Sequence, residues 1–136
     1  MFLCQHFTRE LVWRPGFAAH PLGVTQIAGI AVIAPTAKGY ESLLDERSQA
    51  IDEGSRVDTG SAPIAVCEED LLARRLGGAS LPLRTRPVVA ALFLRVVDRA
   101  RAVTVLREGG FSPVELNDGS FAVGAEQAHG VALVFG

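Results

Sequence analysis

A repeated pattern of apolar residues constrains the fold of this chain more than any other sequence feature. The pattern of residues 29–44 recurs at residues 91–106, and in each copy the apolar spacing changes at Thr36 or Asp98 from two residues to between three and four. Alternation is typical of a strand, the longer spacing is typical of a helix, and Thr and Asp are frequent helix N-caps. The chain therefore contains one strand–helix unit twice, and we expect a cleft between the two copies with walls from both.

The first copy predicts a strand, a helix and three further strands. The first strand covers residues 25–34, the helix follows the cap Thr36, and turn residues divide residues 48–69 into three short strands. A short helix over residues 71–76 then leads into a proline-containing linker over residues 79–87. The buried stripe of the first helix should consist of Ala37, Tyr40, Leu43 and Leu44.

The second copy repeats this order with clearer boundaries. Residues 88–97 read as a strand, Asp98 reads as an N-cap, and residues 99–108 read as a helix that ends at a pair of glycines. The three strands that follow are expected over residues 113–116, 121–124 and 131–135.

Together the two copies predict an α+β fold made of two βαβββ modules. We expect one domain over residues 24–136, with module one at about 24–78, a linker at 79–87 and module two at 88–136, after a lead-in segment over residues 1–23. The modules should form a curved mixed sheet around a cleft, with the helices outside. The core under the two helices should consist of Ile30, Val32, Leu43, Leu44, Leu92, Leu94, Val105, Leu106, Leu133 and Phe135.

Composition excludes several classes of protein. The 136 residues include 13 basic and 15 acidic side chains, so the chain lacks the broad positive potential that attracts nucleic acid. Cys4 and Cys67 fit neither a disulfide framework nor a metal-binding spacing, which indicates a reducing compartment. The longest apolar stretch, residues 27–35, is too short to span a membrane. We therefore expect a cytoplasmic protein that binds neither nucleic acid nor membranes.

Three short stretches make the sequence similar to a known superfamily. The stretch Cys4-Gln5-His6, the pair Val12-Trp13 and the closing residues 130–135 resemble the vicinal oxygen chelate superfamily, and within it the glyoxalase-like branch. That superfamily includes glyoxalase I, extradiol dioxygenases and bleomycin-resistance proteins. The resemblance covers almost the whole chain and implies the glyoxalase-like fold, with a lactoylglutathione-lyase-like activity suggested by resemblance only. In this branch such a segment often lies mid-way along a longer chain of two domains.

The resemblance also implies where a metal would be held. Enzymes of the superfamily bind a divalent metal between the modules, through a His or Gln near the start of each first strand and a Glu on each last strand. Strand parity places the equivalent positions at Gly29, Ala91, Cys67 and Val134. Three of these side chains cannot bind a metal, and a single thiol is not a metal site. We therefore expect no metal and no cofactor.

Phe93 and Arg95 are the first candidates for ligand binding. They share one face of the second copy's strand with Ala91, whereas the alternate residues Leu92 and Leu94 should pack under the helix. Arg95 would then point into the concave side, where a guanidinium beside an aromatic ring could bind a carboxylate or phosphate. The alternative is an arginine at the end of the strand that pairs with a nearby acid or extends into solvent.

Cys67, Glu69 and His6 are the other candidates for ligand binding. Cys67 and Glu69 have the same strand parity and could both face the cleft. For Cys67 the alternative is a small buried hydrophobe, and for Glu69 it is an exposed acidic cluster before a helix. His6 either reaches the cleft from a strand of the lead-in segment or lies at the surface.

Three functions are compatible with these observations. The first is binding of a small organic molecule without a metal, in the way that bleomycin-resistance proteins sequester their ligand. The second is a lyase-type or isomerase-type enzyme whose site is completed by other residues or by a second chain. The third is a structural domain that pairs with a second copy. We expect a homodimer, because the lead-in segment carries large apolar side chains that should be covered, namely Phe2, Phe7, Trp13 and Phe17.

Overall fold

The computed structural model describes residues 19–52, 54–83 and 85–136. Along these residues each module has the predicted order βαβββ, and a short helix follows the first module. The first module comprises β1 (Val24–Ile33), α2 (Lys38–Leu44), β2 (Gln49–Ile51), β3 (Gly54–Val57) and β4 (Ile64–Cys67), and α3 (Glu69–Arg75) comes next. The second module comprises β5 (Val88–Val96), α4 (Arg99–Glu108), β6 (Val114–Glu115), β7 (Phe121–Val123) and β8 (Ala132–Phe135).

These eight strands form one mixed sheet, in the order β2-β3-β4-β1-β5-β8-β7-β6. β1 and β5 pair antiparallel at the centre of the sheet. Each of them also pairs in parallel with the last strand of its own module, so β4 lies beside β1 and β8 lies beside β5. The strand order is therefore symmetric about the β1–β5 pair, as a duplicated unit requires.

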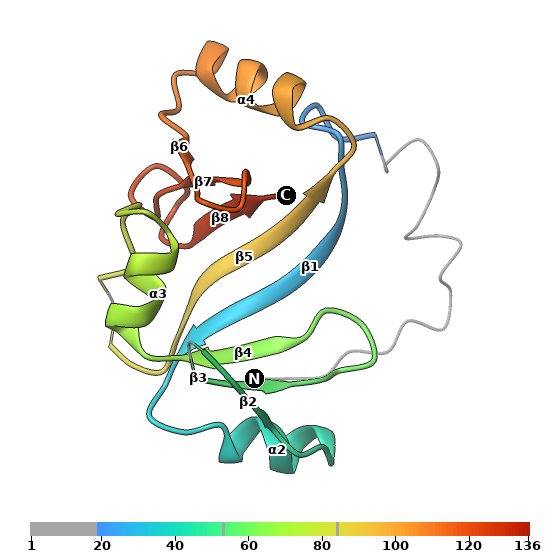
Figure 1. Ribbon diagram of the computed structural model, residues 1–136, viewed down its shortest axis with the longest axis vertical. Coiled ribbons are helices and arrows are strands. Elements are labelled where there is room, and N and C mark those ends of the chain that lie inside the picture. Colours follow the sequence, from blue (N-terminus) through green and yellow to red (C-terminus); the bar gives the residue numbers. More distant parts are fainter. Residues whose placement is uncertain (1–18, 53, 84) are drawn as a thin grey trace.

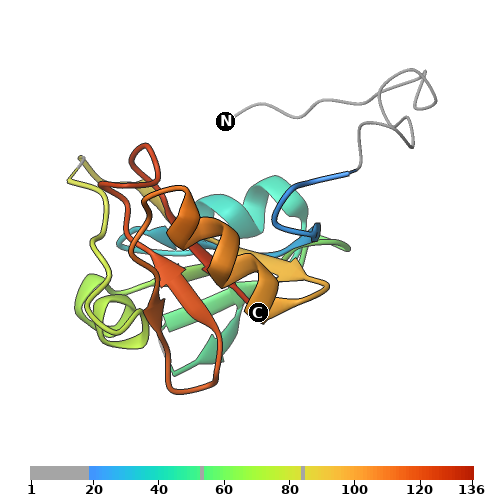
Figure 2. The ribbon, with the colours of Figure 1, turned by 90° about the horizontal axis from the view of Figure 1, so that it is seen from above.

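The sheet is strongly curved, and helices lie on both of its sides (Figure 1). α2 and α4 lie outside the curve at opposite ends of the molecule, which agrees with the prediction, whereas α3 lies inside it (Figure 1). The view from above places α3 beside the β6–β7 hairpin of the other module (Figure 2). The prediction that the helices lie outside is therefore correct for the two module helices and does not extend to α3.

The core under the module helices is smaller than predicted. Val32, Leu106 and Phe135 are buried, and most of the other predicted core residues are half-buried. Leu43 is 42% exposed, so its assignment to the core is wrong. The residues of this helix region that do pack inward, Ala37, Tyr40 and Leu44, follow a spacing of three and four, and Leu43 points away from that stripe.

The two module helices begin differently. Asp98 is the N-cap of α4, and its Oδ1 accepts a hydrogen bond from the N–H of Arg101 at 3.0 Å, as the sequence predicts. The N-cap of α2 is Ala37 instead of Thr36, and the Thr36 hydroxyl accepts a longer bond of 3.3 Å from the N–H of Lys38. Within the described residues, no helix combines the length and apolarity needed to cross a membrane.

Candidate functional site

Small side chains line the concave face of the sheet where the two central strands meet. The register of β1 and β5 places Gly29 opposite Phe93 and Ala31 opposite Ala91. Alternation along each strand puts these four residues on the same face. A Cβ on Gly29 would lie 3.7 Å from Cδ2 of Phe93, so the glycine keeps one side of the ring open.

Helix α3 covers another part of this face. Leu72 and Leu76 have no exposed surface, and they share a core cluster with Ala31, Ala91 and Ala132. Burying two leucine side chains against a row of alanines stabilises the fold by several kcal/mol, about 1.5 to 3 for each side chain. One end of the concave face is therefore core, and the open part of this face lies nearer to Phe93.

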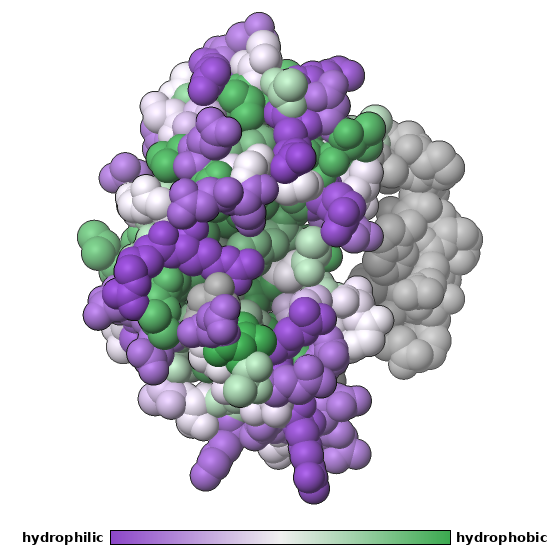
Figure 3. All heavy atoms as spheres, in the orientation of Figure 1, coloured by the Kyte–Doolittle hydropathy of each residue, from purple (hydrophilic) through white to green (hydrophobic). Residues whose placement is uncertain are grey.

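A pocket of about 350 Å³ lies next to Phe93 on the concave face. Its walls are mostly apolar and come from β1, β4 and β5, while two arginines reach it from β3 and α3. Figure 3 shows apolar surface near the centre of this view of the molecule, bordered by hydrophilic side chains. The residues that line the pocket are Ala28, Gly29, Ile30, Ile51, Arg56, Pro63, Ala65, Arg75 and Phe93.

Both arginines of this pocket are held in defined positions. The guanidinium of Arg75 lies over the ring of Phe93, with its Cζ 4.9 Å from the ring centroid, which is a cation–π distance. Arg75 is in the last turn of α3, where a positive charge interacts favourably with the helix dipole. Arg56 forms an ion pair with Asp58 at 3.1 Å, and both side chains are about half exposed.

A smaller pocket of about 150 Å³ lies on the other side of Phe93. It contains Phe93 and Arg95 together, as well as Asp118 and Ser120 from the β6–β7 hairpin. The two pockets share Ala28 and Phe93, and together we call them the Phe93 groove. Arg95 is exposed, so it stands at the rim of the groove rather than deep within it.

Asp118 is the acidic group of the Phe93 groove. The hydroxyl and the N–H of Ser120 both donate hydrogen bonds to Oδ1 of Asp118, the N–H bond being 2.9 Å long. These bonds hold the pKa of Asp118 below its usual value, and the nearby positive charge of Arg75 lowers it further, while partial burial acts in the opposite direction. The carboxyl group is therefore ionised at neutral pH.

The strand register changes one of the four positions at which the resemblance implies a metal ligand. Ile30 pairs with Ile64 in module one, and the equivalent Leu92 pairs with Leu133 in module two. The residue equivalent to Val134 is therefore Ala65, because each follows its paired residue by one, and it is not Cys67. Gly29, Ala65, Ala91 and Val134 do not fit a divalent metal, and no group of three His, Cys, Asp or Glu side chains in the described part of the chain could hold one.

Two other predicted site residues, Cys67 and Glu69, do not line the Phe93 groove. Cys67 is only 2% exposed and belongs to the core cluster of α3, which is the environment of a small hydrophobe. Glu69 begins α3 and forms an ion pair with Arg86 of the linker, beside a different pocket of about 530 Å³ between α3 and the linker. His6 lies outside the described residues.

Arg56, Arg75 and Asp118 are charged groove residues that the sequence interpretation missed. The position of Arg75 could not be predicted from periodicity. The spacing of Leu72 and Leu76 indicates an apolar helix face but not which side of the sheet the helix covers. Arg56 lies opposite Ala65 in the register of β3 and β4, so its side of the sheet follows only once that register is known. The alternation of side chains along β3 was the one sequence signal that could have indicated on which face Arg56 lies.

Comparisons with known proteins identify the fold. No family model and no curated protein matches the chain. Among solved structures, methylmalonyl-CoA epimerase from Mycobacterium tuberculosis matches with a TM-score of 0.52 at 19% identity, over 83% of this chain and 87% of that one. A variant of the Streptomyces coelicolor epimerase, in complex with 2-nitronate-propionyl-CoA, matches with a TM-score of 0.54 at 14% identity, over 82% and 96%.

A hypothetical protein from Bacillus halodurans C-125 matches with a TM-score of 0.53 at 15% identity, over 81% of this chain and 91% of that one. Each of these matches extends over more than four fifths of both chains, so they concern the whole arrangement of the two modules. The neighbours have glyoxalase-like folds. The chain therefore has the glyoxalase-like fold.

Proposed function

We propose that this protein binds a small organic anion in the Phe93 groove and does so without a divalent metal. The observation that supports this most directly is the arrangement of charge around one aromatic ring. Arg75 lies over Phe93, and Arg56 and Arg95 line the two pockets that meet at it. A guanidinium beside an apolar wall is a favourable partner for a carboxylate or phosphate.

The size of the groove indicates what kind of molecule would fit. The larger pocket, at about 350 Å³, is at the small end of the range for ligand sites. Its apolar walls suit a compact body such as an aryl or short acyl group, because that surface is removed from water on binding. The charged groups lie around this body and would orient the anionic end. A small aromatic or acyl carboxylate combines these properties.

Binding is favoured over proton transfer by the shortage of bases in the groove. Among the described residues that line it, Asp118 is the one carboxylate and there is no imidazole. General base catalysis is most efficient when the pKa of the base is near the working pH, and the pKa of Asp118 is lowered. Gly29, Ala65, Ala91 and Val134 also provide no ligand for the metal that would stabilise an enolate in relatives.

An isomerase-type enzyme is the second candidate, because the fold is shared with methylmalonyl-CoA epimerases. It can be separated from the first by incubating the protein with methylmalonyl-CoA in D₂O and following the α-proton by NMR. We expect no exchange above that of the buffer. Exchange that is lost in Asp118→Asn would favour the enzyme, with Asp118 as the base.

The proposed binding can be tested with benzoate as the probe. Isothermal titration and ¹H–¹⁵N NMR should detect benzoate near Gly29, Ala65 and Phe93, and Arg75→Met should weaken its binding about tenfold or more. Arg74→Met is the matched control, because Arg74 is the adjacent exposed residue of α3 and does not line the groove. Equal benzoate affinity in Arg75→Met, Arg74→Met and the unmodified protein would contradict the proposal.

The metal-free part of the proposal has its own measurement. Elemental analysis of the purified protein should find no divalent metal in stoichiometric amount. About one tightly held metal for each chain, with benzoate affinity dependent on it, would show that other residues supply the ligands.

A further inference from the structure

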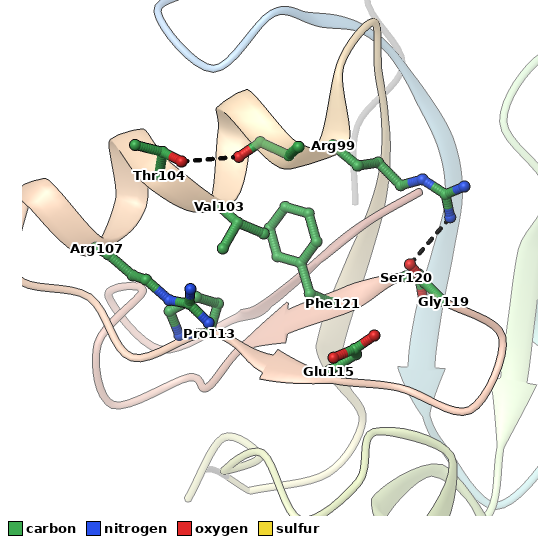
Figure 4. Close-up of a pocket in the computed structure, with 10 residues that line it drawn as sticks. Arg99, Val103, Thr104, Arg107, Pro113, Glu115, Gly119, Ser120 and Phe121 are labelled. Atoms are coloured by element: carbon green, nitrogen blue, oxygen red, sulfur yellow. Dashed lines mark hydrogen bonds between the residues drawn. The ribbon is translucent and has the colours of Figure 1, made fainter.

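Another pocket lies on the outer face of the sheet, between α4 and the β6–β7 hairpin (Figure 4). Its volume is about 360 Å³. It is distinct from the Phe93 groove, and Ser120 at the hairpin is the one residue that lines both. Its floor belongs to the core cluster under α4, which includes Phe121 and Val103.

The pocket forms because one side of α4 does not pack against the hairpin. Ala102 and Leu106 pack into the core, while Ala100, Thr104 and Arg107 face the hairpin with a spacing of four and three residues. Ala100 is too small to fill the space beneath it.

A single hydrogen bond closes this gap at one end. Nη1 of Arg99 donates to the carbonyl of Gly119 at 3.0 Å and so joins the start of the helix to the hairpin turn (Figure 4). The Thr104 hydroxyl contributes no bridge, because it donates to the carbonyl of Ala100 in its own helix. The middle of the pocket is therefore held open rather than filled.

The floor of the pocket is apolar and its ends are cationic. Figure 4 shows Val103 and Phe121 side by side in the middle, with Arg107 near Pro113 at one end and Arg99 at the other. Arg99 is engaged with the hairpin, whereas no hydrogen bond or ion pair to a described residue engages the guanidinium of Arg107. Arg107 is thus the group available to an incoming anion.

The carboxylate of Glu115 limits the negative charge that a ligand in this pocket can carry. It projects from β6 on the hairpin side, across from the helix that carries both arginines. A second negative charge on a ligand would be repelled by this carboxylate. The pocket is therefore better suited to a monoanion with an apolar body than to a phosphate or a dicarboxylate.

We propose that this pocket is a second binding site, which takes an amphipathic monocarboxylate. The carboxylate would pair with Arg107, and a short alkyl or aryl body would lie against Phe121, Val103 and Pro113. The pairing of one fixed charge with an apolar floor selects against cations and against anions without an apolar part. This site does not depend on the Phe93 groove being occupied.

Hexanoate is a suitable probe, with hexylamine as the cationic control and adipate as the dianionic one. ¹H–¹⁵N NMR titration should show hexanoate shifts at Val103, Thr104 and Phe121, which distinguish this pocket from the groove around Gly29 and Phe93. Hexylamine should produce no such shifts, and adipate should bind more weakly than hexanoate.

Two variants should weaken hexanoate binding in this pocket for different reasons. Arg107→Met removes the charge and should weaken hexanoate about tenfold, while Ala100→Leu fills the space from an exposed helix position. Arg101→Met is the matched control, because Arg101 is an exposed arginine of the same helix that does not line the pocket. Unchanged hexanoate affinity in Arg107→Met, or an equal loss of affinity in Arg101→Met, would overturn the proposal, as would shifts confined to the Phe93 groove.

Discussion

Arg95 stands at the rim of the Phe93 groove, and this position determines how much its charge can contribute to the proposed binding of an anion. A charged hydrogen bond contributes about 1.5 to 3 kcal/mol, and exposure to water reduces that figure. Arg75 lies directly over Phe93, so its charge is nearer to the apolar body of any ligand. We therefore expect both arginines to strengthen the proposed anion binding, with the larger contribution from Arg75.

The first prediction concerns Arg95. Arg95→Met keeps much of the apolar stem and removes the charge, so benzoate binding should weaken by about 1.5 kcal/mol or somewhat less, with little change in the free energy of unfolding. Titration calorimetry and thermal melting measure the two quantities. Unchanged benzoate affinity would mean that Arg95 only extends into solvent, which was the alternative interpretation from the sequence.

The second prediction concerns the hydrogen bonds between Ser120 and Asp118. The pKa of Asp118 is lowered in the folded state, so this interaction stabilises the fold when the carboxyl group is ionised, and the contribution is lost as the pH falls through the lowered pKa. Ser120→Ala should therefore cost about 0.5 to 1.5 kcal/mol at pH 7. The difference from the unmodified protein should shrink as the pH falls below the ordinary value of 3.8.

Urea unfolding at a series of pH values measures that difference, and Asp118→Asn provides the control. In the Asn variant the stability difference caused by Ser120→Ala should no longer vary over this pH range. A difference that stays constant from pH 7 to pH 2 in the Asp118 background would contradict the assigned cause.

At the scale of elements, α4 was the most predictable part of the molecule. Its bounds, Arg99–Glu108, agree with the sequence because Asp98 starts the helix with a side-chain bond and two glycines follow its end. The N-cap of α2 is Ala37, one residue after the predicted cap Thr36. Leu43 was misassigned because the buried stripe of this short helix is narrower than predicted and contains Ala37, Tyr40 and Leu44.

The third prediction compares leucines in these two helices. Leu106→Ala should reduce the free energy of unfolding by about 2 to 5 kcal/mol, because Leu106 is buried under α4. Leu43→Ala, at an exposed position in α2, should change it by no more than about 0.5 kcal/mol. Denaturant unfolding of both variants checks the comparison, and similar losses at the two positions would mean that the helix faces are wrongly assigned.

The location of α3 could not be predicted from the sequence, and the candidate site depends on it. Apolar periodicity tells which face of a helix is buried, but the concave and the convex side of the sheet are both apolar. The alternation of side chains along the strand was sufficient to predict that Phe93 and Arg95 share one face. The partner groups Arg56 and Arg75 come from elements whose register is fixed only by tertiary contacts.

At the scale of the whole molecule, exposed apolar side chains indicate association with a second copy of the chain. Several large apolar side chains are exposed on the described part of the chain, including Ile27, Val89 and Val97. We predict a homodimer, with the lead-in segment docked on its own domain or on the second chain. Light scattering at micromolar concentration should give twice the mass of the chain. A monomer would remove both the dimer and the interpretation of this protein as a pairing domain.

Helix α3 links the stability of the fold to the groove in which we propose that a ligand binds. Its seven residues contribute the buried Leu72 to the shared core and Arg75 to the groove, and Leu76 follows directly. A substitution in this helix can therefore affect the free energy of unfolding and the proposed binding site together. Replacing this one segment would redesign the interior face without altering the duplicated framework, whereas drift in its leucines would destabilise both modules at once.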